Sequence, residues 1–448
     1  MKEIFYIEDT PANTISYYFL LVFLVALPFD RFYSELALIG LTLHTLIHAV
    51  TGWKRLPGGL MRPGKGRVDV AAGRGLRLWP GWLVLSLYGL TMAGTIYTAD
   101  PGQAWDEWGK QLALLLFPLI VVFTRLDWRR YQLRLLKAFG LSCFFTTLYL
   151  YAAAFYSIRL RHLPFSSIFS PLYLNHAFSA PLELHATYFS MYIALSLITF
   201  AWLVLHARDV WGRVGYILIF TVLLAAILQL ASRAVFIAVM IAVNGLIPLF
   251  LLKGRARRRF LFAALLFSVL ALALVIGNET LRDRYVVQLR QDLDESTVGK
   301  DGPESRASRW DCAWEMIRAS PWIGYGSGTE RRLLKEKYHE HHMYDSYGNA
   351  LNAHDQYLSF LLKWGVPGLA LYLLLLGTAF VQAYRSRDVF LGGFLVIITL
   401  VSFSENILDV NKGIFFFGFF FSFFFCMPGT RIFIRQYGNK NTLPLMGT

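Results

Sequence analysis

The sequence is poor in charged residues and in cysteine, and it has no polar linkers. Only 16% of its 448 residues are Asp, Glu, Lys or Arg, whereas soluble domains have about 25%. Apolar runs recur instead from Thr14 to Met427. A soluble globular protein and a disordered chain are therefore excluded. The three cysteines have no metal-ligand spacing and are too few for a disulfide framework.

Hydrophobic residues, at 56%, fill twelve segments that are suited to crossing a bilayer as helices. The predicted spans are 14–30, 35–51, 79–97, 111–124, 138–157, 186–206, 214–231, 234–252, 260–277, 364–383, 389–404 and 413–428. The sequence thus predicts an all-α, polytopic membrane protein. The first span follows a stretch with one Lys and three acidic residues, which is unlike a cleaved signal, so we expect it to remain as an anchor. The run Phe415–Phe425 is expected to face lipid.

Basic residues orient the predicted spans. The connections on one side, with both termini, carry 25 Lys and Arg, and the short connections on the other side carry six. Because basic connections stay in the cytoplasm, both termini are expected there, and segment 278–363 is expected on the outer face. This predicts helices one to nine in 1–277, a large and mainly helical periplasmic loop in 278–363, helices ten to twelve in 364–428 and a cytoplasmic tail in 429–448. The net charge of +14 then reflects orientation and not nucleic-acid binding.

The outer segment contains a predicted helix between Pro303 and Pro321. It carries Arg306, Arg309 and Trp310 at helical spacing. Guanidinium groups beside an indole ring can hold a diphosphate and stack on a sugar. An interfacial helix, with arginines on lipid phosphates, fits the same pattern.

Two further patterns in this segment favour structural interpretations. Gly324, Gly326 and Gly328 predict a tight turn, because no strand precedes them as a dinucleotide-binding loop would require. The histidines at 339, 341 and 342 suggest zinc, but the pattern is nonspecific and a solvated stretch is favoured.

Histidine and arginine also stand at predicted helix starts. Asn352 is a plausible N-cap, which would place His354 in the first turn of a helix, where the dipole favours a neutral imidazole. Ser232 can cap the eighth span with Arg233 as its first residue, an arrangement suited to an anion. A capping histidine and a snorkelling arginine are the structural alternatives. Glu405 and Asp409 lie near the outer end of the eleventh span. They could bind a cation or pair with an arginine, although a solvated face is favoured.

In their order along the chain, these pieces resemble the O-antigen ligase/polymerase superfamily of bacterial inner-membrane glycosyltransferases. The matching features are Ser232-Arg233-Ala234 opening a span, Arg306 four residues before Trp310, the stretch 321–328, and His354-Asp355-Gln356-Tyr357-Leu358 with Gly365 and Gly368. The resemblance covers roughly 186–404. The first 150 residues share only hydropathy with the family.

The resemblance implies a ligase of the inner membrane that acts on the periplasmic face. It would transfer O-antigen from undecaprenyl diphosphate to lipid A–core by an inverting, metal-independent single displacement, without a cofactor. The implied essential residues are His354, Arg233 and Arg306, and the implied substrate-binding residues are Arg309, Trp310, Tyr357 and His185. The chemistry agrees, since guanidinium groups can neutralise a diphosphate leaving group and a neutral histidine can accept a hydroxyl proton.

Two other functions remain open. An O-antigen polymerase or protein O-oligosaccharyltransferase belongs to the same superfamily, but polymerases commonly have an Arg, ten residues and a Gly in outer loops. Here that spacing occurs only on the predicted cytoplasmic side, for example from Arg129 to Gly140. Protein-glycosylating members tend to have a larger C-terminal extension than the 21 residues after Met427. A lipid-linked glycan transporter is disfavoured because the spans contain almost no ionisable residues.

Overall fold

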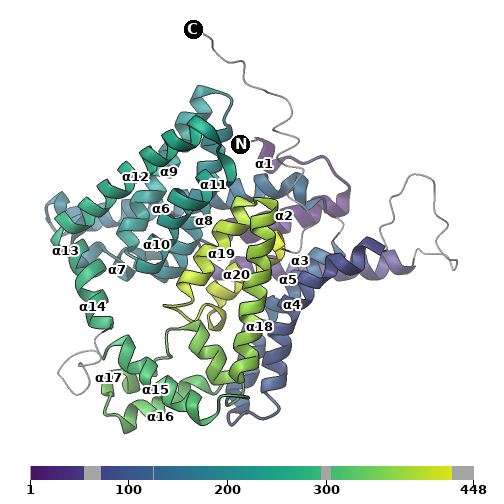
Figure 1. Cartoon of the computed structure of the whole chain (residues 1–448). Coiled ribbons are helices and arrows are strands. Elements are labelled where there is room, and N and C mark those ends of the chain that lie inside the picture. The colour runs from purple at the N-terminus through teal and green to yellow at the C-terminus, as the bar shows by residue number, and fades with distance from the viewer. Residues whose placement is uncertain (1, 55–71, 125, 294–303, 426–448) are drawn as a thin grey trace.

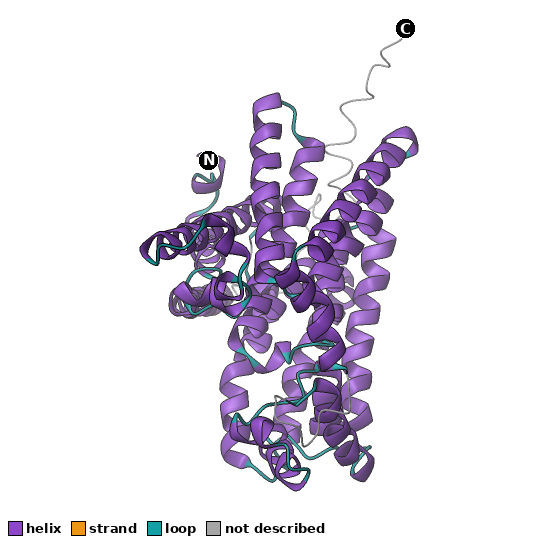
Figure 2. Cartoon of the chain, turned by 90° about the vertical axis from the view of Figure 1, so that its left-hand side faces the viewer, coloured by secondary structure: helices purple, strands orange, loops and turns teal. Residues whose placement is uncertain are grey.

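The computed structural model describes residues 2–54, 72–124, 126–293 and 304–425, and over these residues it contains helices and no strand (Figures 1 and 2). The helices are α1 (Lys2–Phe5), α2 (Pro11–Ala26), α3 (Arg31–Lys54), α4 (Ala72–Gly94), α5 (Pro101–Phe123), α6 (Trp128–Leu160), α7 (His176–Ser179), α8 (Ala186–His206), α9 (Val210–Leu230), α10 (Arg233–Ile241), α11 (Ile247–Leu251), α12 (Gly254–Gly277), α13 (Glu279–Arg282), α14 (Gln288–Asp292), α15 (Arg306–Ala319), α16 (Glu330–Glu340), α17 (Tyr344–Gly348), α18 (Gln356–Ser386), α19 (Val389–Val401) and α20 (Asn411–Phe425). The all-α prediction is confirmed. Most of the basic connection 52–78, the residue Pro303 and the predicted tail lie outside the described residues.

Each of the twelve predicted spans falls on a helix or, for 234–252, on α10 and α11 joined by one π turn. By length and composition, six helical stretches in the described residues can cross a membrane. They are Trp128–Leu160, Ala186–His206, Val210–Leu230, Arg233–Leu251, Gly254–Gly277 and Gln356–Ser386. Shorter apolar helices include α2, α19 and α20. The chain is thus a multi-pass membrane protein, and the number twelve stays a prediction.

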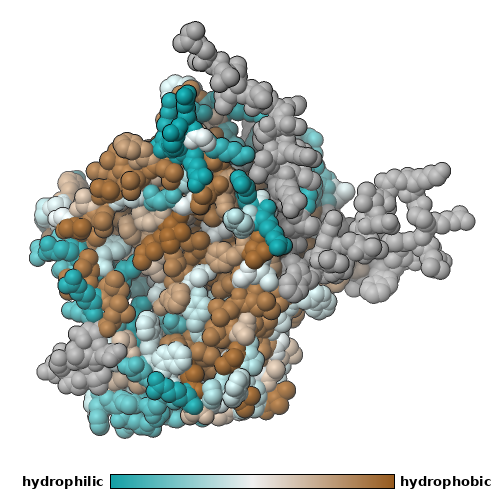
Figure 3. Space-filling view, in the orientation of Figure 1, coloured by the Kyte–Doolittle hydropathy of each residue, from teal (hydrophilic) through white to brown (hydrophobic). Residues whose placement is uncertain are grey.

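Burial separates a central helix from peripheral ones. In the most apolar stretch of α8, 83% of the residues are buried, whereas in the corresponding stretch of α12 only 17% are. Leu265 and Phe262 of α12 are 61% and 72% exposed. Figure 3 shows apolar surface across the middle of the molecule, with hydrophilic residues towards its top and bottom. This is the pattern expected where lipid covers the helices.

The Phe-rich run does not face lipid, so that prediction is wrong. Phe416, Phe420 and Phe424 of α20 are each at most 2% exposed. The ring of Phe420 lies 5.0 Å from that of Phe139, while Phe394 contacts the rings of several α20 phenylalanines. Large apolar side chains suit the inside of a membrane bundle as well as its outside, so hydropathy could not distinguish the two.

The predicted glycine turn is confirmed as a joint between distant parts of the chain. Gly324, Gly326 and Gly328 all have positive φ. A Cβ atom on Gly326 would lie 2.6 Å from the carbonyl oxygen of Gly94, and one on Gly328 would lie 2.4 Å from the backbone nitrogen of Ala104. Since only glycine allows these approaches, the turn packs segment 304–363 against the α4–α5 connection.

The connections that were assigned to the outer side lie together at one end of the molecule. Lys412, the second residue of α20, donates to the carbonyl oxygen of Glu183 at 2.7 Å. Thr98, between α4 and α5, donates to the carbonyl oxygen of Ser327 at 2.6 Å. At this end α15, α16 and α17 lie below the apolar helices, and α15 and α16 contact α18 (Figure 1). The candidate site residues lie here.

Candidate functional site

Two arginines that are far apart in the sequence share one carboxylate. Arg233 is the first residue of α10, after the N-cap Ser232, and Arg306 is the first residue of α15. Nη2 of Arg233 forms an ion pair with Oδ2 of Asp292, and Nε of Arg306 lies 3.8 Å from the same oxygen. Arg306 also donates to the carbonyl oxygen of Ser404 at 3.2 Å. Two guanidinium groups, each from the first residue of a helix, therefore converge on one anion.

Local sequence explains how α10 and α15 begin. Ser305 accepts a hydrogen bond from the backbone N–H of Ser308 at 3.1 Å, so it caps α15. The expected helix up to Pro321 is confirmed. Ser232 stands at the predicted cap position of α10, although its side chain forms no capping hydrogen bond.

Arg284 and Arg309 extend the positive charge around Arg233 and Arg306, and these four residues form the arginine cluster. Arg309 is 8% exposed. Burial, followed by the positive charge of Arg306 among other neighbours, lowers the pKa of Arg309. Burial and then the charges of Arg233 and Arg306 lower the pKa of Arg284. The guanidinium groups face mutual repulsion that one aspartate offsets only in part.

Several buried nitrogens of this arginine cluster have no hydrogen-bond partner among the described residues. They are Nη1 of Arg233, Nε of Arg284 and Nε of Arg309. Buried N–H groups are normally paired, so unpaired ones call for an explanation. An anion with several acceptor oxygens, such as a diphosphate, has the chemistry to pair them.

His354 lies beside the arginine cluster, but not in the first turn of α18 as predicted. Asp355 is the N-cap instead, since its carboxylate accepts the Leu358 N–H at 2.9 Å and the helix begins at Gln356. Asn352 does not cap the helix; its side chain accepts the N–H of His354 at 3.1 Å. His354 therefore precedes the helix, in a backbone conformation with φ of 51°.

The hydrogen bond of the imidazole assigns its tautomer. Nδ1 of His354 lies 3.2 Å from the carbonyl oxygen of Asn352, which can only accept. Nδ1 must therefore carry the proton, and Nε2 keeps its lone pair. Burial lowers the pKa of His354 to about 4, with Glu405 raising it and Arg309 and Arg306 lowering it further. The predicted neutral imidazole is consistent with this environment, with Nε2 as its basic atom.

The other sequence candidates lie near His354 or near the arginines. Trp310 donates to the carbonyl oxygen of Ala353 at 3.0 Å, and Tyr357 donates to that of Thr399 at 2.9 Å. Their polar atoms are thus engaged within the protein. His185 is the residue before α8, and its buried Nδ1 has no partner among the described residues. Burial, followed by Lys412 and Arg306, lowers the pKa of His185 to about 4.

Glu405 and Asp409, the two acidic candidates, lie in different surroundings. Glu405 accepts a hydrogen bond from Thr187 at 3.1 Å on the side of His354. Asp409 does not form a solvated face, because it is paired with Lys363 at 2.7 Å in the interior. Hydropathy places both residues at a helix end, but only the turn at Ile407–Asp409 directs them to different sides.

The three neighbouring histidines are solvated, as expected. His339, His341 and His342 are exposed, and His341 lies 2.9 Å from a carboxylate oxygen of Glu315. Across the described parts of the chain, no group of three His, Cys, Asp or Glu side chains is arranged to hold a metal ion.

Sequence reasoning missed Asp292 and Arg284. Both belong to a run between residues 279 and 295 in which acidic and basic residues are interspersed without a recognisable motif. Only their ion pair and electrostatic contacts with Arg233 and Arg306 distinguish them from their neighbours.

Comparison with known proteins identifies a family. Among curated proteins, no match is found. Residues 218–373 match the family model described as O-antigen ligase. This stretch begins within α9, ends within α18 and contains Arg233, Arg306 and His354. The match covers about a third of the chain and supports membership of the O-antigen ligase/polymerase superfamily, whose members are glycosyltransferase-like enzymes.

Proposed function

We propose that this protein is an O-antigen ligase of the bacterial inner membrane. It transfers O-antigen polysaccharide from undecaprenyl diphosphate to a sugar of lipid A–core on the periplasmic face. The observation that carries the proposal is the convergence of Arg233 and Arg306 on one anionic position beside the neutral His354. The charge asymmetry of the connections supports both the orientation and cytoplasmic termini.

The arginines act on the leaving group. The donor diphosphate takes the place of the Asp292 carboxylate between Arg233 and Arg306 and pairs with the free N–H groups of the cluster. As the bond between the anomeric carbon and the diphosphate oxygen breaks, negative charge grows on that oxygen. Fixed guanidinium groups stabilise this charge without reorganisation, so the proposed transfer needs no metal ion.

His354 acts on the acceptor. An acceptor hydroxyl oxygen forms a bond to the anomeric carbon on the face opposite the departing diphosphate, and Nε2 of His354 takes the hydroxyl proton. One such displacement inverts the anomeric configuration. We assign contacts with the sugars to Trp310, Tyr357, Arg309 and His185, which lie near His354 or the arginines.

A polymerase or a protein O-oligosaccharyltransferase would use the same donor chemistry. The ligase is favoured because the Arg-to-Gly spacing of polymerases occurs only on the side assigned to the cytoplasm. A transporter would retain activity after loss of His354.

Reconstitution tests the proposal. Purified protein is combined with undecaprenyl-diphosphate glycan and lipid A–core, with and without EDTA. Core-linked glycan is the expected product, and EDTA should not reduce it. Longer lipid-linked glycan would identify a polymerase instead. Loss of activity in EDTA would overturn the metal-independent mechanism.

The substitution Asp292→Asn is expected to strengthen binding of anions in the cluster. The neutral amide no longer competes with the diphosphate for Arg233 and Arg306, while the unbound protein loses an attractive ion pair. The variant should therefore have a lower melting temperature than wild type without ligand and a larger increase in melting temperature with inorganic pyrophosphate. Asp283→Asn, at an exposed position of the same segment, is the control. An unchanged response to pyrophosphate would contradict this role of Asp292.

Transfer should depend on pH through His354. The base must be unprotonated, so activity is present above its pKa and is lost as the pH falls through it. In the free enzyme kcat/KM should fall near pH 4, the region to which burial lowers the pKa of His354. A bound diphosphate offsets Arg306 and Arg309, which raises this pKa, so kcat should fall at a higher pH than kcat/KM. Identical profiles for kcat and kcat/KM, measured on purified enzyme, would contradict the arrangement.

A further inference from the structure

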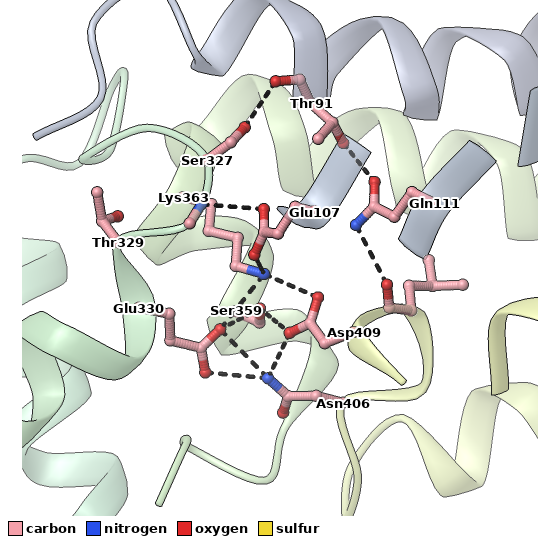
Figure 4. A network of polar contacts seen from close by, with 12 residues as sticks. Thr91, Glu107, Gln111, Ser327, Thr329, Glu330, Ser359, Lys363, Asn406 and Asp409 are labelled. Atoms are coloured by element: carbon pink, nitrogen blue, oxygen red, sulfur yellow. Dashed lines mark hydrogen bonds and ion pairs between the residues drawn. The ribbon is translucent and has the colours of Figure 1, made fainter. Parts of the chain in front are cut away.

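We propose that Glu330 and Asn406 are positioning residues that hold the backbone of His354 in its unusual conformation, and that a buried ion cluster fixes them in place. This inference rests on the proposed function, because it assigns His354 a role that needs precise placement. The ion cluster consists of Lys363 with the carboxylates of Glu107, Glu330 and Asp409 (Figure 4).

The ion cluster joins four separate parts of the chain. Nζ of Lys363 in α18 lies 2.8 Å from Glu107 of α5, 2.7 Å from Asp409 before α20 and 3.7 Å from Glu330 of α16. Lys363 and Glu330 are 1% and 3% exposed. Asn406 lies under the cluster and donates to Glu330 at 2.9 Å and to Asp409 at 2.9 Å. Figure 4 shows Lys363 directed between these carboxylates.

Two members of this network contact the peptide groups on either side of His354. Oε1 of Glu330 accepts the N–H of Ala353 at 3.2 Å, and Oδ1 of Asn406 accepts the N–H of Asp355 at 2.9 Å. The N–H of His354 between them is taken by Asn352. Three consecutive backbone donors are therefore bound by side chains, and two of these side chains are bonded to each other.

The conformation of His354 explains why such support is needed. Its φ of 51° lies in the left-handed region, which is unfavourable for a residue with a Cβ atom. Backbone strain of this kind persists only where the surroundings over-determine it. The conformation directs the imidazole towards the environment of Glu405, Arg306 and Arg309, whose charges act on its pKa. The network thus places the proposed base beside the arginine cluster.

The composition of the ion cluster supports a positioning role over simple stabilisation. Three carboxylates share one ammonium group in the interior, and burial raises the pKa of Glu330. Buried ion clusters contribute little to stability compared with apolar packing, because their groups must be removed from water. What apolar side chains cannot supply is an acceptor for each of the two peptide N–H groups beside His354.

The test compares side chains that reach the His354 backbone with a buried polar residue that does not. Asn406→Ala and Glu330→Ala remove acceptors from Asp355 and Ala353, whereas Glu330→Gln keeps an acceptor oxygen for Ala353. Thr91→Val is the matched control, since it loses a buried hydrogen bond to Gln111 and does not contact the 353–355 backbone. All variants are purified full-length and compared by melting temperature, by kcat and donor KM, and by the rate at which diethyl pyrocarbonate modifies His354, measured by mass spectrometry.

Both alanine variants should lose about tenfold or more in kcat while the donor KM is retained, because a displacement near 1 Å costs up to about 100-fold and the arginines are untouched. His354 should be modified faster in them than in wild type. Glu330→Gln should recover most of kcat despite a lowered melting temperature, and Thr91→Val should keep both kcat and the modification rate of wild type.

Two kinds of failure can be told apart. If folded Asn406→Ala and Glu330→Ala show wild-type kcat and wild-type modification of His354, the positioning inference is overturned and the proposed ligase function stands. If wild-type protein transfers no glycan but His354 is still modified faster in the alanine variants, the proposed function is wrong and the positioning of His354 holds. Equal losses in Thr91→Val would also overturn the inference.

Discussion

Replacement of His354 by alanine is expected to lower the rate of glycan transfer by about 10²–10⁴-fold, the usual contribution of a positioned general base. The donor is already activated by its diphosphate, so deprotonation of the acceptor hydroxyl is the task left to a base. His354 fits this task because its Nδ1 proton is held by the carbonyl oxygen of Asn352 and its Nε2 is unprotonated. Initial rates on purified wild type and variant measure the loss.

A matched control is available in the same part of the chain. His339→Ala removes an exposed imidazole from α16 and should leave the rate unchanged. Protein level and membrane insertion of His354→Ala should equal those of wild type, because insertion depends on the hydropathy of the spans and not on this imidazole. If cells with His354→Ala still produced full-length smooth lipopolysaccharide, the assigned mechanism would be wrong.

Replacement of Arg233 by alanine is expected to lower the rate of glycan transfer by about 10²–10³-fold. Removal of a fixed hydrogen-bond donor that stabilises a developing anion has an effect of this size. The loss should appear in both kcat and the donor KM, since the guanidinium group contacts the diphosphate before and during bond breaking. Arg233→Lys should recover only part of the activity, because an ammonium group cannot form paired bonds in a plane. Rates at several donor concentrations separate these effects.

Arg282→Ala is the control for charge alone. Arg282 is an exposed arginine at the end of α13, and its removal lowers the positive charge of the same region by the same amount. It should leave transfer unchanged. Equal losses in Arg282→Ala and Arg233→Ala would show that Arg233 acts only through the general field of the protein.

Much of the site was accessible from the sequence because its residues stand at helix starts. Arg233 follows the predicted cap Ser232, and Arg306 lies in the helix predicted between Pro303 and Pro321; each is the first residue of a helix. The placement of His354 was less accessible. Asn352 and Asp355 are both good caps, and local sequence does not show that Asn406 binds the Asp355 N–H from 51 residues away.

Burial of polar and aromatic side chains was the least accessible feature. Asp409 and Glu405 lie only four residues apart, but Asp409 is the one that meets the buried Lys363. Likewise, the Phe-rich run has the composition of a lipid-facing helix and lies in the core. Which neighbours a helix meets is decided by long-range packing, and hydropathy carries no such information.

The low charge that marks this chain as a membrane protein is determined by the sequence itself. Bilayer insertion depends on local hydropathy, and orientation depends on the count of basic residues in each connection, so both can be predicted one segment at a time. The anionic position was decided only by the tertiary structure. It requires Asp292 to contact Arg233 and Arg306, which lie 59 and 14 residues away in the chain. The strained backbone of His354 likewise requires hydrogen bonds from Glu330 and Asn406, which belong to two other parts of the chain. Such contacts arise from the packing of whole helices, which no local pattern specifies.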